Sequence, residues 1–189
     1  LGEARKALNR IRDDSDRAAA VITSFRTMLK DGEHQRAPLL LSDLVSESLD
    51  ILSTDIQKHG VVVRTNSPGP LPFIQGDQVQ LRQVFLNLMS NAIDAMDGIV
   101  DRPHLLAIRF DVTEGGFVTV SIEDSGKGLE TKDPDRIFDA FFTTKAKGMG
   151  MGLFISRMIV EAHGGHLHAR SQPGRTTFHV TIPIDSRPE

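Results

Sequence analysis

The sequence predicts an α+β domain, a two-layer α/β sandwich with three helices on one face of a mixed sheet, preceded by a long N-terminal helix. Three observations predict this fold class. Stretches in which apolar and polar residues alternate, as in strands, are interspersed with segments of helical periodicity. Glycine- and proline-containing turns separate these segments. The N-terminal segment carries an apolar repeat that belongs to a helix.

Composition sets the outer limits of the interpretation. The chain has 189 residues, 39% apolar and 25% charged, which suits one globular core with an appendage. The net charge of −3 gives no basic field for nucleic acid, and the absence of cysteine excludes disulfides and thiolate chemistry. No apolar run approaches the roughly 20 residues of a membrane helix. The chain does not begin with Met, so we expect a piece of a longer protein.

A long helix is predicted over residues 1–31. A narrow apolar seam of this kind needs a partner helix, because one helix cannot bury it alone. We therefore favour a helical bundle or dimer contact over a helix packed on its own domain. We expect residues 1–36 and 37–189 to form separate domains. The seam is spaced alternately by three and four residues, with one polar member: Leu8, Ile11, Ser15, Ala18, Ile22, Phe25 and Leu29.

The next elements are predicted from caps and turns. After a short apolar stretch at residues 39–41, Ser42 is expected to cap a helix that runs to about residue 59. Strands follow at residues 61–65 and 71–75, on either side of a turn. Asp77 is then expected to cap a helix that ends at about residue 96.

Two hairpins and one helix complete the expected order. Alternating residues 104–112 and 117–123 predict a hairpin that turns at a glycine pair. Residues 125–150 lack periodicity and contain several glycines. A helix is predicted over residues 152–163, and a closing hairpin turns at residues 173–174.

Two asparagines in the 77–96 helix need an explanation. Asn87 and Asn91 are four residues apart, so they share a face with Asp94. Asparagine is a mediocre helix former, because its side chain competes for backbone hydrogen bonds. Plain solvent exposure is one interpretation. The other is a set of oxygen ligands for a hard cation such as Mg²⁺.

The segment Asp124-Ser-Gly126-Lys-Gly128 ends a predicted strand. Its glycines allow a sharp turn and a close approach to a planar ligand. The Asp124 carboxylate beside them suits an exocyclic amine. Taken alone, such a segment is more often only a turn.

A second glycine-rich segment precedes the 152–163 helix. Gly148, Gly150 and Gly152 alternate there, which leaves free N–H groups at the positive end of the helix dipole, where anions bind. Three phenylalanines in residues 138–142 are costly in an exposed loop, so we expect a lid or a docking segment. Lys145 could reach a phosphate.

In this order and spacing, the segments resemble the catalytic, ATP-binding domain of sensor histidine kinases, in the GHKL superfamily shared with DNA gyrase, heat-shock chaperone ATPases and mismatch-repair ATPases. The resemblance covers residues 37–184 and implies the Bergerat ATP-binding fold. Its motifs are Asn87-Leu-x-x-Asn91-Ala (N box), Asp124-x-Gly126-x-Gly128 (G1 box), Phe138-x-x-Phe141-Phe142-Thr-Thr-Lys145 (F box), Gly148-x-Gly150-x-Gly152-Leu (G2 box) and Gly174-x-Thr-Thr177-Phe-x-Val-x-Ile-Pro183 (closing strand).

The resemblance implies transfer of the ATP γ-phosphoryl group to a histidine, for relay to an aspartate of a response regulator receiver domain. ATP or ADP and Mg²⁺ are the implied ligands. Asp124 would bind the adenine amine, Asn87 and Asn91 would ligate Mg²⁺, and Lys145 would cover the phosphates. The other implied nucleotide-binding residues are Asp94, Gly126, Gly128, Phe141, Thr143, Thr144, Gly148, Gly150, Gly152, Leu153 and Thr177.

The resemblance also assigns the N-terminal helix to the second helix of a dimerisation hairpin, so we expect a homodimer in the full-length protein. The preceding helix should carry the acceptor histidine, and no such segment occurs here. We therefore expect a kinase domain that does not phosphorylate itself. The domain is expected to be cytoplasmic, in a parent protein that is either soluble or anchored in a membrane. His34 is followed by Gln35 rather than by an acid, which argues against an acceptor role. His166 and His168 are interpreted as a hydrated strand face rather than a metal site.

Three alternatives remain open at this point. An ATPase of the gyrase or chaperone kind would carry a glutamate as general base one turn before the metal-binding Asn91, where this sequence has Asn87. A serine kinase of the anti-sigma type shares the fold. The heptad helix and the phenylalanine-rich segment of this sequence argue against that alternative. A pure nucleotide-binding module would bind without transferring.

Overall fold

The structure, a computed structural model, describes residues 36–129, 133–145 and 149–185. The long helix and the domain predicted at the N-terminus lie almost wholly outside these residues. The elements are β1 (Ala37–Leu39), α2 (Leu41–Ile51), α3 (Ser53–Lys58), β2 (Val62–Asn66), β3 (Ile74–Gly76), α4 (Gln78–Met96), β4 (Leu105–Thr113), β5 (Phe117–Asp124), the 3-10 helix η1 (Pro134–Phe138), α5 (Gly152–Ala162), β6 (His166–Gln172) and β7 (Arg175–Pro183).

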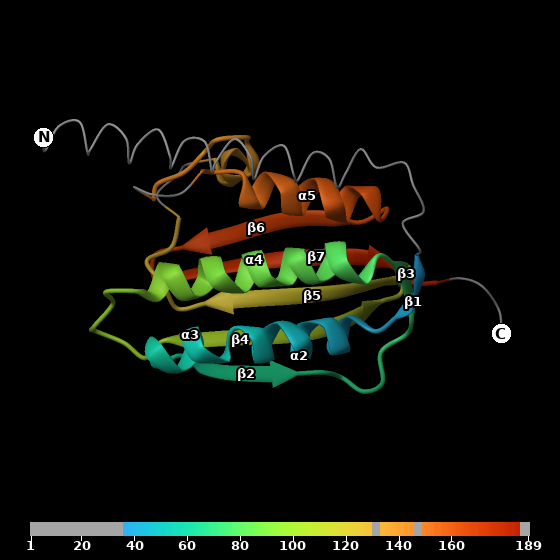
Figure 1. The fold of residues 1–189 in the computed structure, drawn as a ribbon, viewed down its shortest axis with the longest axis horizontal. Helices are drawn as coiled ribbons and strands as arrows, with labels where there is room; N and C mark the ends of the chain where they lie inside the picture. Colours follow the sequence, from blue (N-terminus) through green and yellow to red (C-terminus); the bar gives the residue numbers. More distant parts are fainter. Residues whose placement is uncertain (1–35, 130–132, 146–148, 186–189) are drawn as a thin grey trace, which may run out of the picture.

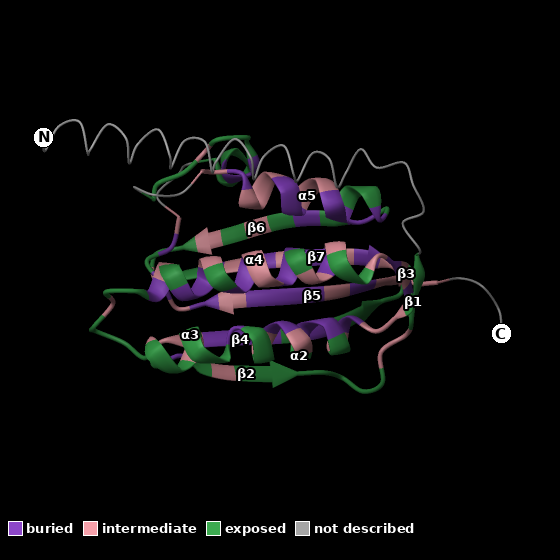
Figure 2. Ribbon diagram, in the orientation of Figure 1, coloured by how far each residue is buried: buried purple, intermediate pink, exposed green. Residues whose placement is uncertain are grey.

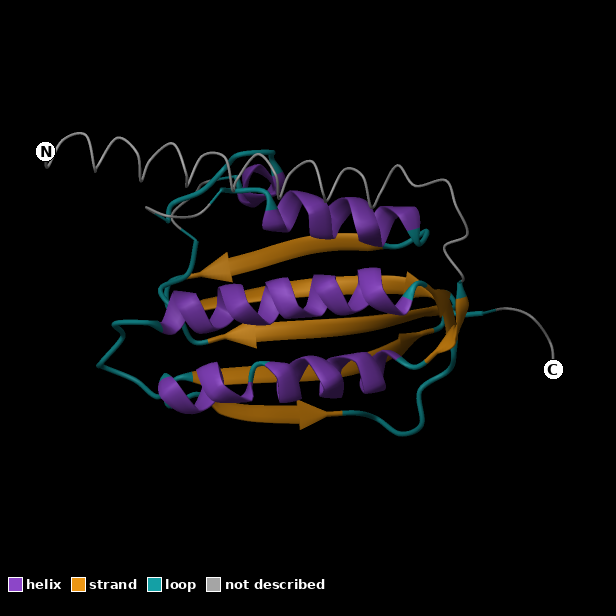
Figure 3. Ribbon diagram, viewed as in Figure 1, coloured by secondary structure: helices purple, strands orange, loops and turns teal. Residues whose placement is uncertain are grey.

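A five-stranded sheet forms one layer of the domain. Its order is β2-β4-β5-β7-β6, with β2 and β4 parallel and the other neighbours antiparallel. Helices α2, α4 and α5 lie side by side across one face of this sheet (Figures 1 and 3). The α+β sandwich with a mixed sheet is therefore confirmed. A two-stranded antiparallel sheet of β1 and β3 lies at one end.

The core fills the space between the two layers (Figure 2). Helix α4 buries a stripe with helical spacing that includes Leu81, Phe85 and Leu88, each fully buried. Strands β5 and β7 alternate between buried and partly exposed residues, as expected of a sheet with one covered face. The opposite face of the sheet is accordingly the more polar one.

The helix after β1 differs from its prediction. It begins at Leu41 rather than after Ser42, and Leu40 occupies the N-cap position without a side-chain cap. Buried Leu41 and Leu44 fix the helix start through packing, which outweighs the capping preference of serine. The helix is also interrupted at Leu52, so its second half is the separate α3.

The predicted start of α4 is confirmed in atomic detail. The Asp77 side chain accepts hydrogen bonds from the N–H groups of Val79 and Gln80, at 2.9 and 3.0 Å. His163 supports the same corner: its Nδ1 lies 2.7 Å from the Ile159 carbonyl oxygen, and its Nε2 accepts from the Asp77 N–H at 3.0 Å. This imidazole therefore ties the end of α5 to the beginning of α4.

Both predicted hairpins are present. β4 and β5 pair antiparallel around Gly115 and Gly116, and β6 and β7 pair around residues 173–174. Within the ranges that the structure describes, no helix combines the length and the apolar character that a membrane span needs.

Candidate functional site

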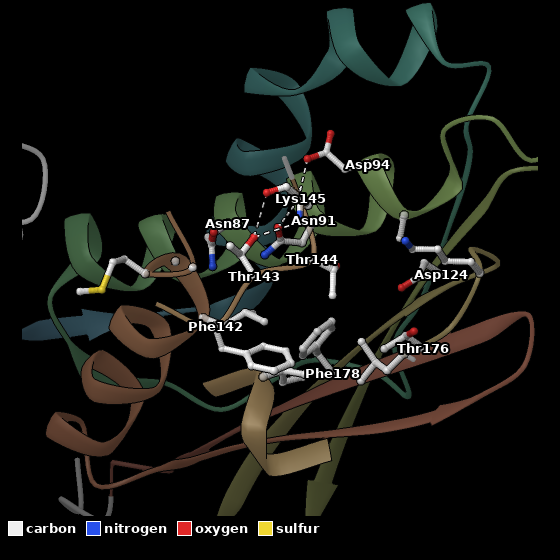
Figure 4. Close-up of a pocket in the computed structure, with 18 of the residues that line it drawn as sticks. Asn87, Asn91, Asp94, Asp124, Phe142, Thr143, Thr144, Lys145, Thr176 and Phe178 are labelled. Carbon is white, nitrogen blue, oxygen red and sulfur yellow. Dashed lines mark hydrogen bonds and ion pairs between the residues drawn. The ribbon is translucent and has the colours of Figure 1, made fainter. Parts of the chain in front are cut away.

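A cavity of about 460 Å³ opens where the C-terminal half of α4 meets the end of β5, the beginning of β7 and the start of α5 (Figure 4). Segments far apart in the sequence contribute to it. Of the residues predicted from sequence to form the site, those that line the cavity are Asn87, Asn91, Asp94, Asp124, Gly128, Thr143, Thr144, Lys145, Gly150, Gly152 and Leu153.

Four predicted site residues do not belong to this lining. Gly148 lies outside the described residues. Gly126, Phe141 and Thr177 are described but lie off the cavity wall. For each of these three residues, the structure shows why it does not line the cavity.

Asp124, the last residue of β5, is the buried charge of the site. Its side chain is 2% exposed, and burial raises its pKa to about 6. The Gly126 N–H donates to Asp124 Oδ1 at 2.9 Å, which opposes this rise, while the charge of Glu123 adds to it. A buried carboxylate in a cavity wall is suited to accept a hydrogen bond from a ligand.

The glycines after Asp124 shape the turn that holds it. A side chain at Gly126 would place its Cβ 2.6 Å from the Ala95 carbonyl oxygen, so the turn packs directly under the end of α4. Gly128 has a positive φ of 82°, and a Cβ added there would lie only 2.6 Å from the Gln172 carbonyl oxygen. Gly126 thus supports Asp124 from behind instead of contacting the cavity.

Strand β7 contributes Thr176 rather than Thr177. Thr176 pairs in register with Asp124, is 3% exposed and lines the cavity. Neighbouring strand residues point to opposite faces, so Thr177 lies on the other side, where its hydroxyl donates to Glu123 Oε2 at 3.4 Å. The structure therefore corrects the assignment of Thr177 to the cavity wall.

A cluster of oxygens on α4 holds the Lys145 ammonium. Lys145 Nζ donates to Asn91 Oδ1 and to Asp94 Oδ2, both at 2.7 Å (dashed lines in Figure 4). We call Asn91 and Asp94, together with Asn87, the α4 oxygen corner. Its geometry accommodates a positive group between an amide oxygen and a carboxylate.

Asn87 joins the α4 oxygen corner to α5. Its Nδ2 donates to Ser156 Oγ at 2.9 Å. A Cβ at Gly152 would overlap Asn87 Oδ1, so the start of α5 approaches this amide more closely than any other residue type allows. The glycine at this position therefore serves close packing of α5 onto α4.

The start of α5 has an uncompensated positive end. Met151 occupies its N-cap position, and no described side chain caps the first turn. Gly150, Met151 and Gly152 line the cavity there. Free N–H groups at a helix N-terminus attract anions, so this wall of the cavity suits phosphate.

The phenylalanines before Lys145 do not act as one group. Phe138 is buried and packs edge-on against Phe178, with ring centroids 6.4 Å apart. Phe142 lines the cavity beneath the Arg136 guanidinium. Phe141 instead is 69% exposed, has a positive φ of 68° and does not line the cavity to which the resemblance assigned it.

Several lining residues escaped the sequence analysis. Thr176 and Phe178 are two residues apart in β7 and therefore share one face of the sheet. Knowledge of the strand register would have identified both as lining residues. Apolar lining residues carry no motif of their own, and Ser156 gives no sequence indication of its contact with the site. The lining residues missed are Ala95, Lys127, Leu129, Ile137, Phe142, Met149, Met151, Thr176 and Phe178.

Comparison with known proteins identifies the class. Residues 76–186 match the family described as histidine kinase-, DNA gyrase B-, and HSP90-like ATPase. This match covers more than half of the chain, so the chain belongs to that family. Within it, the relatives are sensor histidine kinases, and the domain is the ATP-binding catalytic domain of that type, as the sequence predicted.

Proteins similar in sequence and proteins similar in structure are both histidine kinases. The chain is 38% identical over 184 residues to the sensor histidine kinase TmoS of Ectopseudomonas mendocina, a match that covers 96% of this chain and 19% of that protein. It is 33% identical over 185 residues to the sensor histidine kinase ZraS of Escherichia coli K12, covering 97% and 39%. The chain thus spans less than half the length of these curated relatives. The catalytic domain of histidine kinase ThkA superposes with a TM-score of 0.70 at 27% identity, covering 79% of this chain and 96% of that domain.

Proposed function

We propose that this chain is the catalytic part of a protein histidine kinase, which transfers the γ-phosphoryl group of ATP to a histidine for relay to a response regulator aspartate. One observation carries the proposal: Asp124, Asn91 and Gly150 come from distant segments and line one cavity. The cavity volume of about 460 Å³ lies within the range of small-molecule sites.

In this proposal, adenine binds at the end of the cavity formed by β5 and β7. The Asp124 carboxylate accepts a hydrogen bond from the adenine amine, and Thr176 lies beside it. Phe178 and Leu129 add an apolar wall for the planar base. The triphosphate then extends toward the N-terminus of α5.

We propose that Mg²⁺ binds with the nucleotide at the α4 oxygen corner. Amide and carboxylate oxygens are the ligands that Mg²⁺ prefers, and it commonly takes one or two from the protein and the rest from phosphate and water. The Lys145 ammonium held by Asn91 and Asp94 supports this fit, because it is a positive group bound by the same oxygens. When bound, the ion would neutralise charge on the phosphates.

Transfer to a protein side chain is favoured over ATP hydrolysis by the chemistry at Asn87. Water activation needs a group that takes up a proton, and an amide does not. The Asn87 amide is instead engaged with Ser156. Positioning and charge neutralisation are sufficient for phosphoryl transfer to an acceptor presented from outside.

The partners follow from this function. We propose a response regulator receiver domain as the downstream partner, a homodimer through the N-terminal helix, and a cytoplasmic location, where ATP and response regulators occur. A structure of histidine kinase ThkA in complex with the response regulator protein TrrA shares this fold at 23% identity, with a TM-score of 0.69. That likeness concerns the fold alone.

Two measurements test the proposal. Calorimetric titration of the chain with ADP and with ATP, each with Mg²⁺, should give saturable binding at one site. The natural protein that contains this chain should then acquire acid-labile, base-stable phosphate from γ-labelled ATP, and the label should move to a receiver domain. Release of inorganic phosphate without labelled protein would instead identify an ATPase, and phosphoserine on a partner would identify a serine kinase.

A further inference from the structure

The Lys145 ammonium lies on two oxygens that the proposed Mg²⁺ would use. Its Nζ donates to Asn91 Oδ1 and to Asp94 Oδ2, each at 2.7 Å (Figure 4). Because an ammonium can only donate, the Asn91 atom in contact with it is the amide oxygen. Asn91 and Asp94 are three residues apart on α4, so they are neighbours on one face of the helix. Together they form a cation position in which the cation is a side chain of the same protein.

An ammonium and a divalent ion compete for these oxygens. Mg²⁺ lies about 2.1 Å from its oxygen ligands. With Lys145 Nζ 2.7 Å from the same two atoms, the two positive centres would lie within about 5 Å of each other and repel. Binding of the ion at Asn91 and Asp94 therefore favours departure of the ammonium.

The ammonium can depart while its backbone stays in place. The Lys145 N–H donates to Thr143 Oγ1 at 3.1 Å, which places the residue at the edge of the cavity. The four-carbon stem of a lysine is flexible, so the ammonium can change partners by rotation of the side chain. Gly150 and Gly152, at the start of α5, line the same cavity. Phosphates bound at that helix N-terminus would offer the ammonium new anionic partners.

We propose that Lys145 couples Mg²⁺ binding to nucleotide binding: its ammonium occupies Asn91 and Asp94 until phosphates draw it away, so that the ion binds well only together with the nucleotide. The inference rests on the proposed nucleotide function. The affinity of a site falls with the fraction of time for which the site is available. The ion pair is exposed, so the ammonium holds these oxygens only modestly. We expect Lys145 to weaken the binding of Mg²⁺ alone by about threefold to fivefold.

The test is an NMR titration of the ¹⁵N-labelled 189-residue chain with MgCl₂ alone, at constant ionic strength. The measured quantity is the Kd for Mg²⁺, followed on the side-chain NH₂ signal of Asn91. Lys145→Gln should lower this Kd about threefold to fivefold. Lys58→Gln is the matched control, because it removes the same charge from an exposed lysine in the last turn of α3, which does not line the cavity. It should change the Kd by less than about twofold.

The same spectra test the contact itself. Before Mg²⁺ is added, Lys145→Gln should shift the side-chain NH₂ signal of Asn91, because the oxygen of that amide loses a charged donor. Lys58→Gln should not shift it. An Asn91 signal that is the same in wild type and in Lys145→Gln would overturn the proposal, since the ammonium would then not occupy the amide oxygen in solution.

A calorimetric titration with ADP separates exchange from simple repulsion. It is run in EDTA and in Mg²⁺ below the Kd measured for Mg²⁺ alone, and the ratio of the Kd in EDTA to the Kd in Mg²⁺ is compared between proteins. If the phosphates draw the ammonium away, Lys145→Gln should not raise this ratio by more than about twofold. A rise of threefold to fivefold would overturn the proposal, because the lysine would then oppose the ion with nucleotide bound as well.

The remaining outcomes are also decisive. Equal Kd values for Mg²⁺ in wild type and Lys145→Gln, or no saturable shift in either protein, would overturn the competition and leave the nucleotide function intact. Absence of ADP binding by the wild-type chain in either buffer would instead defeat the proposed function, whatever the titration with MgCl₂ alone gives.

Discussion

Replacing Asp124 by asparagine tests the adenine end of the cavity, because two measured quantities should move in opposite directions. The substitution keeps the shape of the side chain, removes its charge and turns one oxygen into NH₂. The Gly126 N–H already donates to Asp124 Oδ1 at 2.9 Å, so the asparagine oxygen should stay there. Its NH₂ group then replaces Oδ2 and cannot accept from the adenine amine.

The stability effect follows from the raised pKa. Burial raises the pKa of Asp124 from 3.8 to about 6, which at about 1.4 kcal/mol per unit corresponds to roughly 3 kcal/mol. Because the folded chain binds this proton more tightly, the contribution to the free energy of unfolding is fully present below pH 4. It is lost as the pH rises through about 6. At pH 7.5 the ionised, buried carboxylate of the wild type is therefore destabilising.

The asparagine variant should consequently be the more stable protein at pH 7.5. We expect a gain of about 1–3 kcal/mol in the free energy of unfolding, or several degrees in Tm. The advantage should shrink below pH 6 and disappear near pH 4, where Asp124 is protonated in the wild type. Urea unfolding at a series of pH values measures this difference directly.

Nucleotide affinity should fall in the same variant. Loss of a hydrogen bond to a charged acceptor costs about 1.5–3 kcal/mol, which corresponds to roughly 10- to 150-fold in Kd for ADP. Wild-type affinity should also weaken below pH 6, as Asp124 is protonated, whereas that of the variant should lack this component. The nucleotide phosphates titrate in the same way with both proteins. The difference in pH dependence between wild type and variant therefore reports on Asp124 alone.

Unchanged ADP affinity in Asp124→Asn would refute the adenine assignment. A variant that loses stability and affinity together would refute the electrostatic reasoning, because the effect would then come from damaged packing. A stable variant with weak binding is the expected result.

Three further substitutions test other walls of the site. Gly152→Ala places a methyl group against the Asn87 amide oxygen of the α4 oxygen corner, so we expect a free energy of unfolding lower by about 1–3 kcal/mol and weaker ADP binding. Gly115→Ala is the control, because its added Cβ meets only ordinary contacts, and it should change neither quantity. Urea unfolding and calorimetric titration measure the two effects. Thr176→Val should weaken ADP binding severalfold, whereas Thr177→Val on the opposite sheet face should not, and equal effects would contradict the strand parity. Lys145→Gln should change the unfolding free energy by less than about 1 kcal/mol, because its ion pair is exposed, but should weaken ATP binding more than adenosine binding if the ammonium contacts phosphate.

Much of the fold could be predicted because its decisive interactions are local. Asp77 caps α4 through N–H groups two and three residues away, and the Gly115 turn joins neighbouring strands. Ser42 shows the limit of this reasoning. Its capping preference is also local, but the start of α2 is fixed by buried Leu41, whose contacts come from elsewhere in the fold.

The candidate site could be predicted only as far as motifs specify it. Asp124 and Asn91 were found because an unusual residue type in an unusual place marks each of them. Thr176 and Thr177 are chemically identical, and their roles are separated only by the register that places Thr176 opposite Asp124.

Lys145 illustrates the same limit for a charged residue. The sequence leads to the prediction that a lysine near a glycine-rich segment reaches phosphate, but it does not say what holds the ammonium otherwise. The structure places it on Asn91 and Asp94, residues more than 50 positions earlier in the chain. Such a contact depends on how the loop after η1 crosses α4, which no local pattern records. A positive group bound by an amide oxygen and a carboxylate of α4 is nevertheless the physical reason for proposing a cation at that corner, because a hard cation prefers the same oxygen ligands.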